Sequence, residues 1–211
     1  MKWKVGDTTI TKIQEIVYPE FSDVIPAATP DVVKKVKWLF PDFVTDEGHL
    51  SLSVHSLIVE TPGATLIVDT CIGNDRDHNP FEVMHMLSTS YMEDMIASGY
   101  HPDGVDYVLC THLHLDHVGW NTKMVDGKWV PTFPNASYLM SKQDLDFWGS
   151  IDANTEDDFM QLQRKVFDDS MQPVLDAGLA KPVESTAEVC EGVRLVPTPG
   201  HTPGHQATLI S

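Results

Sequence analysis

Cysteine is scarce in this sequence. Three cysteines stand among the 211 residues, at Cys71, Cys110 and Cys190, far apart and each in an apolar surrounding. An odd number at such spacing is not typical of a disulfide framework, so we predict small buried thiols in a reducing compartment. The amino-terminal stretch MKWKVGDTTI also lacks the apolar core of a secretory signal. We therefore expect a cytoplasmic location.

Basic residues and long apolar runs are lacking as well. The chain has 14 lysines and arginines against 31 aspartates and glutamates, which gives a formal net charge of −17. This charge argues against a nucleic-acid partner, because phosphate binding requires clustered cations, and against an anionic membrane surface. No stretch approaches the length of a membrane span, so no membrane association is predicted.

The composition is otherwise that of an ordinary globular protein. Hydrophobic residues make up 42% of the chain, and we expect one domain over residues 1–211. Apolar alternation, short apolar runs and turn residues predict strands in residues 2–18, two strands in 51–70, a strand in 105–111, a hairpin turning at Asp126-Gly127, a strand in 136–140, and strands flanking a loop in 193–211. Strands, then helices, then strands again predict a layered α/β fold with two sheets.

Three helices are predicted from their start signals. Asn79, Pro80 and Glu82 are suited to the cap, first and third positions of a helix over about 80–98, which Gly99 would end. Two more helices are expected to open at Ser141 and Thr155.

A proline-interrupted segment, residues 21–43, carries four aromatic side chains at Phe21, Trp38, Phe40 and Phe43. It is either a flap with a short helix near 31–38 or a loop held by these aromatics to its own core.

The segment THLHLDHVGWN, residues 111–121, concentrates groups that bind metals. In an extended backbone His112 and His114 point to the same side, and Asp116 continues the alternation. His117 leaves that alternation as the chain turns. Imidazole and carboxylate suit borderline divalent ions, above all zinc. Half of the ten histidines lie in residues 112–117 and 201–205, both after buried strands, so we predict a metal site.

The motifs HLHLDH and TPGHTPGH together resemble the His-x-His-x-Asp-His signature and the later histidine loop of the metallo-β-lactamase-fold hydrolases. The strand end LIVDT and the 84-residue gap from His117 to His201 agree with this resemblance, which covers roughly residues 50–211. It implies a four-layer αββα sandwich with a metal pair at one edge.

Carried onto this sequence, the resemblance implies five ligands. His112, His114 and His201 would hold a first metal, and Asp116 and His117 a second. Asp69 would orient ligands from beside the metals, although an aspartate there could also just cap a turn. His205 is expected beside the site rather than on a metal. His55, within a predicted strand, is expected to be packed, and His78, His85 and His101 show no partner spacing.

One departure concerns the carboxyl end. In the family a bridging aspartate follows the histidine loop and a last histidine comes later, but after His205 this chain has only QATLIS. We therefore expect that the last strands and helices of the sandwich are missing. The complete enzyme would hold two zinc ions, with manganese or iron also compatible. Whether the 211-residue chain is active by itself stays open.

The implied reaction is hydrolysis. Two adjacent divalent ions lower the pKa of a bridging water, so that hydroxide forms near neutral pH and attacks a polarised carbonyl or phosphoryl group. Asp116, besides holding metal, could pass a proton to the leaving group and would then be catalytic.

The motifs are most similar to the lactonase branch, which opens acyl-homoserine-type lactones, and to its organophosphate-hydrolysing relatives. The expected partner is a small, uncharged and partly apolar substrate, either a lactone or a related neutral ester. Alternatives are a phosphotriester or a thioester of the glyoxalase II type. A single-iron oxygenase and a non-catalytic metal-binding fragment also remain open, as does the oligomeric state.

Overall fold

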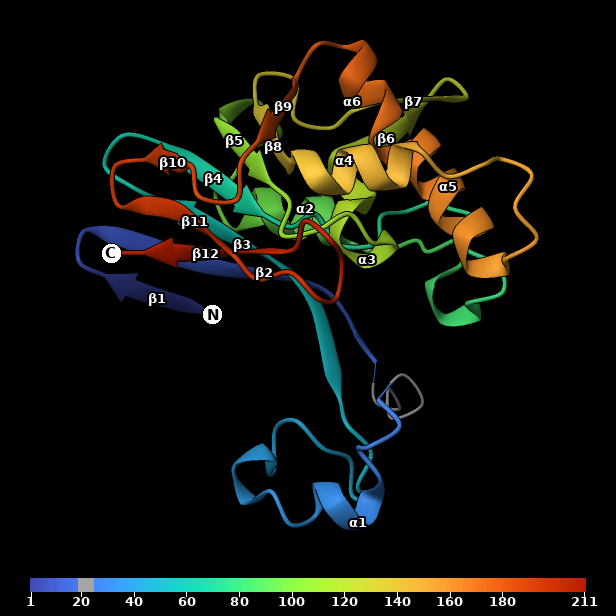
Figure 1. Cartoon of the computed structure of the whole chain (residues 1–211). Helices are drawn as coiled ribbons and strands as arrows, with labels where there is room; N and C mark the ends of the chain where they lie inside the picture. The colour runs from blue at the N-terminus through green and yellow to red at the C-terminus, as the bar shows by residue number, and fades with distance from the viewer. Residues whose placement is uncertain (19–24) are drawn as a thin grey trace.

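The computed structural model describes residues 1–18 and 25–211 (Figure 1). Seven strands form a large sheet in the order β1-β2-β3-β4-β5-β8-β9. Their bounds are Lys2–Val5, Thr8–Tyr18, Leu52–Glu60, Thr65–Val68, Tyr107–Leu109, Ser137–Ser141 and Ala180–Val183. Strands β1 to β4 pair antiparallel, whereas β4, β5, β8 and β9 run parallel. The loops that follow the parallel strands therefore meet at one edge of the sheet.

A second, three-stranded sheet packs on the large one. It has the order β10-β11-β12, with bounds Glu188–Cys190, Val193–Pro197 and Gln206–Ile210. Val193 and Leu195 of β11 form one buried apolar cluster with residues of β3, β4 and β5, namely Val59, Leu66, Val68 and Leu109. The facing sides of the two sheets thus make the sandwich core.

Helices cover the opposite face of the large sheet. Ile58 lies next to Val59 in β3 but belongs to a different core cluster, because successive strand residues point to opposite faces. That cluster includes side chains of α2 (Tyr91–Ala97), α4 (Lys142–Gly149), α5 (Asp158–Ser170) and α6 (Gln172–Asp176). The predicted α/β class with two sheets is confirmed, while the outer helical layer of a four-layer sandwich stays a prediction.

The predicted hairpin is present. Strands β6 (Thr122–Val125) and β7 (Lys128–Pro131) pair antiparallel. Asp126 and Gly127 both have positive φ angles, 49° and 75°. Two such residues are what the tight turn of a two-residue hairpin requires.

The helix predicted over 80–98 is wrong in its first half. Residues Glu82–Met84 form only a 3-10 turn, and α2 begins at Tyr91. Met86 has a left-handed φ of 47°, and its backbone N–H donates to the carbonyl of Arg76. Asn74 binds the backbone of Thr89 through both ends of its amide. Hydrogen bonds from Met86 and Thr89 to the loop of residues 74–76 therefore replace the backbone hydrogen bonds of a helix. The predicted end at Gly99, with φ 95°, is confirmed.

The other two predicted starts differ in detail. Ser141 precedes α4 as expected, but its side chain makes no capping hydrogen bond. Helix α5 begins at Asp158 instead of near Thr155. Asp157 is its cap, because the carboxylate accepts a hydrogen bond from the N–H of Met160 at 3.0 Å.

Residues 25–51 form a small lobe that stands apart from the two sheets and continues into β3 at Leu52 (Figure 1). It contains α1 (Pro30–Val33), a 3-10 helix (Lys37–Leu39) and a bridge between Val44 and Leu50. The short helix expected near 31–38 is thus split into two turns, and Phe21 lies outside the described residues. None of the described helices is long and apolar enough to cross a membrane.

Candidate metal centre

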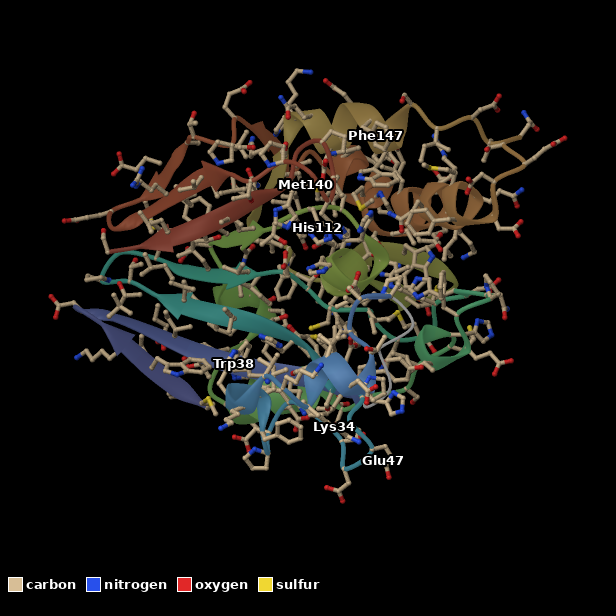
Figure 2. The ribbon with its side chains drawn as sticks, turned by 60° about the horizontal axis from the view of Figure 1, so that its bottom comes forward. Lys34, Trp38, Glu47, His112, Met140 and Phe147 are labelled. Carbon is tan, nitrogen blue, oxygen red and sulfur yellow. The ribbon has the colours of Figure 1, made fainter. Side chains whose placement is uncertain are left out.

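Three loops build the site: the loop after β4, the loop after β5 and the loop that precedes β12. The segment after β5 is bent rather than extended, and His114 occupies the cap position of the short helix α3 (Leu115–Val118). Leu113 and Leu115 are buried, so they anchor this segment in the core. The bend turns His112 inward, so that it is nearly fully buried (Figure 2).

Three histidines converge from two loops. One ring nitrogen from each of His112, His114 and His201 lies within 4.8 Å of the other two. His114 Nδ1 and His201 Nε2 are 3.0 Å apart. Within the part of the chain that the structure describes, the buried Nε2 of His112 has no hydrogen-bond partner. A buried nitrogen without a partner is costly unless something binds it, so these residues fit a metal ion.

The electrostatics of the cluster agree with this fit. Burial, and then the neighbouring imidazoles, lower the pKa of His112 to about 2 and that of His114 to about 4. Both rings are therefore neutral near pH 7. Metals bind the neutral imidazole, since a protonated ring has no free lone pair.

A carboxylate–histidine pair lies beside this cluster. Asp69 Oδ2 accepts a hydrogen bond from His117 Nδ1 at 2.8 Å, and His117 Nε2 is 3.3 Å from Asp116 Oδ2. Burial disfavours the charged ring, but the two carboxylates outweigh it and raise the pKa of His117 to about 10. Without a bound ion, His117 thus carries the positive charge that the carboxylates need. With Nδ1 occupied by Asp69, Nε2 is the nitrogen available to a metal.

Asp69 is held in its role by the backbone. It follows β4 with a left-handed φ of 56°, and its two carboxylate oxygens accept hydrogen bonds from the N–H and hydroxyl of Thr111 at 2.7 and 2.8 Å. The prediction that Asp69 stands beside the ligands stays a prediction. The geometry agrees with it, because Asp69 contacts His117 while it also ties the β4 loop to the β5 loop.

The loop that carries His201 is fixed by Asp144 of α4. This buried carboxylate accepts hydrogen bonds from Thr202 Oγ1 at 2.9 Å and from the N–H of Gly204 at 2.6 Å. A Cβ atom on Gly204 would lie 2.2 Å from Ser141 Oγ. His205 lies in the same loop, and its Nδ1 is hydrogen-bonded to Thr198 Oγ1. The centroid of the His205 ring lies 4.9 Å from that of His112. His205 thus lies beside the cluster.

Glu15 of β2 is a site residue that sequence reasoning missed. Its carboxylate accepts hydrogen bonds from the N–H groups of Ile72 and Gly73, at 2.7 and 3.1 Å, and from Trp120 Nε1 at 2.6 Å. It therefore joins the loop after Asp69 to the segment after His117. Burial raises the pKa of Glu15 in spite of these bonds. The available signal was a carboxylate whose neighbours two positions away in the strand, Ile13 and Val17, are apolar.

A cavity of about 370 Å³ opens at the carboxylate–histidine pair. Asp69, Asp116 and His117 form its polar wall. Its apolar wall comes from β3, β4 and the 3-10 turn, through Leu52, Val54, Leu57, Val68 and Met84. His55 also lines it and has its Nδ1 on the carbonyl of Ser53 at 2.8 Å.

Two cysteines and two histidines outside the cluster have other environments. Cys71 and Cys110 are buried, and burial raises the pKa of both thiols, so they stay protonated. His78 is buried with its Nδ1 on the carbonyl of Met84 at 3.1 Å, and His85 pairs with Asp77 at 3.2 Å.

Comparison with known families identifies the architecture. A model described as the metallo-beta-lactamase superfamily matches residues 51–211. The chain belongs to this superfamily. Two solved structures show the same fold, both covering 100% of this chain. One is the hydrolase AbOPH (TM-score 0.72, 23% identity, 69% of that chain), and the other is AidC, described as a dizinc quorum-quenching lactonase (TM-score 0.71, 21% identity, 70% of that chain).

Curated relatives carry related names. An N-acyl homoserine lactonase of Bacillus cereus is 28% identical over 178 residues, which are 79% of this chain and 62% of the relative. A probable metallo-hydrolase of Mycobacterium tuberculosis is 27% identical over 179 residues, which are 76% of this chain and 53% of the relative. The chain thus spans between half and two thirds of the length of these two superfamily relatives.

Proposed function

We propose that this member of the metallo-beta-lactamase superfamily is a two-metal hydrolase of lactones or related neutral esters. The observation that carries the proposal is the convergence of His112, His114 and His201, where the buried Nε2 of His112 has no hydrogen-bond partner among the described residues. Asp116 and His117 lie beside that cluster, at the mouth of the apolar cavity.

The ligand assignment follows the positions of the donor atoms. His112, His114 and His201 would hold the first ion, and Asp116 with His117 would contribute to the second. Imidazole and carboxylate donors favour zinc, and manganese or iron also suits them. When bound, such ions lower the pKa of a water molecule and polarise the carbonyl under attack.

The residues of the chain have separate tasks in this proposal. Asp69 holds the ring of His117 in one orientation and one tautomer through the bond at Nδ1. Asp116 is ionised, because His117 lowers the pKa of its carboxyl although burial raises it. An ionised carboxylate that lines the cavity can accept a proton from the attacking water and deliver it to the leaving oxygen, so we assign this role to Asp116.

The proposed substrate is small, uncharged and partly apolar. The cavity presents apolar side chains opposite its polar wall, which suits an acyl chain attached to an ester carbonyl. The net charge of −17 disfavours polyanions. The names of the curated lactonase relatives support a lactone. All three cysteines are free, which agrees with the reducing cytoplasm that we propose as the location.

The test combines metal analysis with a substrate panel. Purified full-length protein loaded with zinc is expected to hold two ions and to hydrolyse acyl-homoserine lactones faster than aryl esters, phosphotriesters and glutathione thioesters. Tight metal binding without turnover of any of these would overturn the proposal and favour a non-catalytic role. One iron per chain would favour an oxygenase. Faster turnover of a thioester or a phosphotriester would reassign the substrate within the same site.

A further inference from the structure

Arg76, in the loop after β4, is among the largest fully buried side chains of the described residues, with 1% of its surface exposed. Burial lowers its pKa to about 10, so the guanidinium stays charged near pH 7. In the described part of the chain it forms no salt bridge, and its Nε and Nη1 atoms have no hydrogen-bond partner. A buried charge without a paired carboxylate lowers stability. The guanidinium is therefore expected to have a task other than stabilising the core.

The guanidinium binds the segment that follows α3. Its Nη2 donates to the carbonyl of Thr122 at 2.9 Å, to the hydroxyl of Thr122 at 2.7 Å, and to the carbonyl of Gly119. Its central carbon lies 4.1 Å from the ring centroid of Trp129 in the β6–β7 hairpin. The hydroxyl of Thr122 donates in turn to the carbonyl of Asp169 in α5 at 2.6 Å. One side chain thus joins the loop after β4 to this segment, to the hairpin and to α5.

The same segment is also bound by the backbone of the loop after β4. The carbonyl of His117 accepts a hydrogen bond from the N–H of Thr70, and the N–H of Gly119 donates to the carbonyl of Cys71, both at 2.7 Å. The approach is so close that a Cβ atom on Gly119 would lie 1.7 Å from the carbonyl oxygen of Ile72. The chain that leaves His117 is therefore held from two directions, by this backbone and by the buried guanidinium.

We propose that Arg76 is a positioning residue for the second metal ion. The inference rests on the proposed function, in which Nε2 of His117 binds that ion. Asp69 fixes the ring of His117 at Nδ1, and Thr70 fixes its carbonyl. Arg76 fixes the carbonyls of the residues that follow, so that Nε2 arrives at one position. None of the described hydrogen bonds of Arg76 reaches the three histidines of the first ion, so binding of the first ion should not depend on it.

Zinc titration of the full-length protein tests the inference without requiring activity. Arg76→Met keeps the length of the side chain and removes its donors. It should weaken binding of the second ion by roughly 10- to 100-fold, as is typical when a group that orients a metal ligand is lost, and leave the first ion unchanged. The matched control is Arg164→Met. Arg164 also donates to a carbonyl, that of Gly149, and lies over the ring of Phe167, but it belongs to α5, and binding of both ions should be unchanged.

A positioning role is separated from a purely structural one by rescue and by a metal-free measurement. Arg76→Lys restores a donor and the charge, so it should recover part of the affinity for the second ion. In the metal-free protein, the Nδ1–H of His117 that is bound to Asp69 should give a separate downfield proton resonance. This resonance should broaden in Arg76→Met and persist in Arg164→Met. Circular dichroism shows whether each variant is folded.

Thr122→Val keeps the test decisive where Arg76→Met does not fold, because it removes one acceptor of the guanidinium at nearly constant shape. It should weaken binding of the second ion alone, by several-fold. Equal weakening of both ions, or unchanged binding of the second ion in these variants, would overturn the inference and leave the two-metal site intact. A wild type that binds two ions but hydrolyses no ester would overturn the proposed function alone. A wild type that binds only one ion would overturn both.

Discussion

The Nε2 atom of His112 is buried and has no hydrogen-bond partner in residues 1–18 and 25–211, so single substitutions in the cluster around it test which residues bind the metal. We expect His114→Ala or His201→Ala to abolish tight zinc binding, because each removes one of the three nitrogens that converge there. His78→Ala should retain it, since His78 is bonded to the carbonyl of Met84 instead. Metal content after dialysis measures the difference. Equal retention by all three variants would contradict the ligand assignment.

His78 predicts a pH dependence of stability. Burial, and then the charge of Arg76, lower its pKa from 6.5 to about 4. Above pH 6.5 the ring is neutral in both the folded and the unfolded chain. Between pH 6.5 and 4 only the unfolded chain takes up the proton, so the free energy of unfolding falls as pH falls, by up to about 3 kcal/mol.

The measurement is urea unfolding of the wild type and of His78→Gln at pH 6.5 and pH 4. Other groups titrate in both proteins, so only the difference in pH dependence between them belongs to His78. The wild type should lose about 3 kcal/mol more than the variant over this interval. Identical losses would mean that the ring is accessible to protons in the folded protein.

At the scale of elements, loops from different strands are held by buried carboxylates, and Glu15 is the clearest case. Glu15→Gln keeps the volume but places an amide N–H₂ opposite donors that now bind a carboxylate, so at least one buried donor loses its acceptor. We expect a loss of roughly 1–3 kcal/mol in stability.

Thermal unfolding measures this loss, with Glu93→Gln as the control because Glu93 is exposed on α2. The Glu15 variant should melt several degrees lower, since 1 kcal/mol corresponds to about 2–4 °C for a chain of this length. Equal unfolding midpoints for the two variants would show that the hydrogen bonds of Glu15 make no net contribution to stability.

The same scale shows what could be predicted from sequence. Strand periodicity and the turn at Asp126-Gly127 were sufficient for the hairpin, because these signals are local. Residues before Tyr91 were mispredicted as helical because their backbone N–H groups bind a preceding loop, at the carbonyl of Arg76 and the side chain of Asn74, instead of helical carbonyls. Glu15 was missed because its hydrogen-bond partners lie 57 to 105 residues away in the sequence.

The residues of the metal cluster could be predicted because they lie in two short motifs. Their spacing indicated the residue types and the two segments, but not how the segments are brought together. That depends on Asp144, whose carboxylate holds Thr202 and Gly204, and sequence reasoning saw Asp144 only as part of a helix start. Contacts between distant segments are decided by packing, which no local pattern encodes.

At the scale of the whole molecule, the site lies where the two sheets and the helices meet. Gln206 begins β12 and binds both the carbonyl of Thr111, through its N–H, and that of Cys110, through its amide. The loop with His201 is thereby joined to the large sheet. An ion held between these loops would cross-link segments that lie far apart in the sequence, so metal binding and global stability should be coupled.

This coupling predicts the effect of metal removal. When the free concentration of an ion is about 1,000 times its dissociation constant, binding stabilises the folded state by roughly 4 kcal/mol. This corresponds to a rise of about 10 °C in Tm for a chain of this length. A chelator should therefore lower the Tm of the zinc-loaded protein by about 10 °C, and added zinc should restore it. In His114→Ala the chelator should change nothing, because the variant holds no tightly bound ion. Calorimetry with and without chelator measures the Tm of the wild type and of the variant. A wild-type Tm that is unchanged by the chelator would show that no ion links these loops.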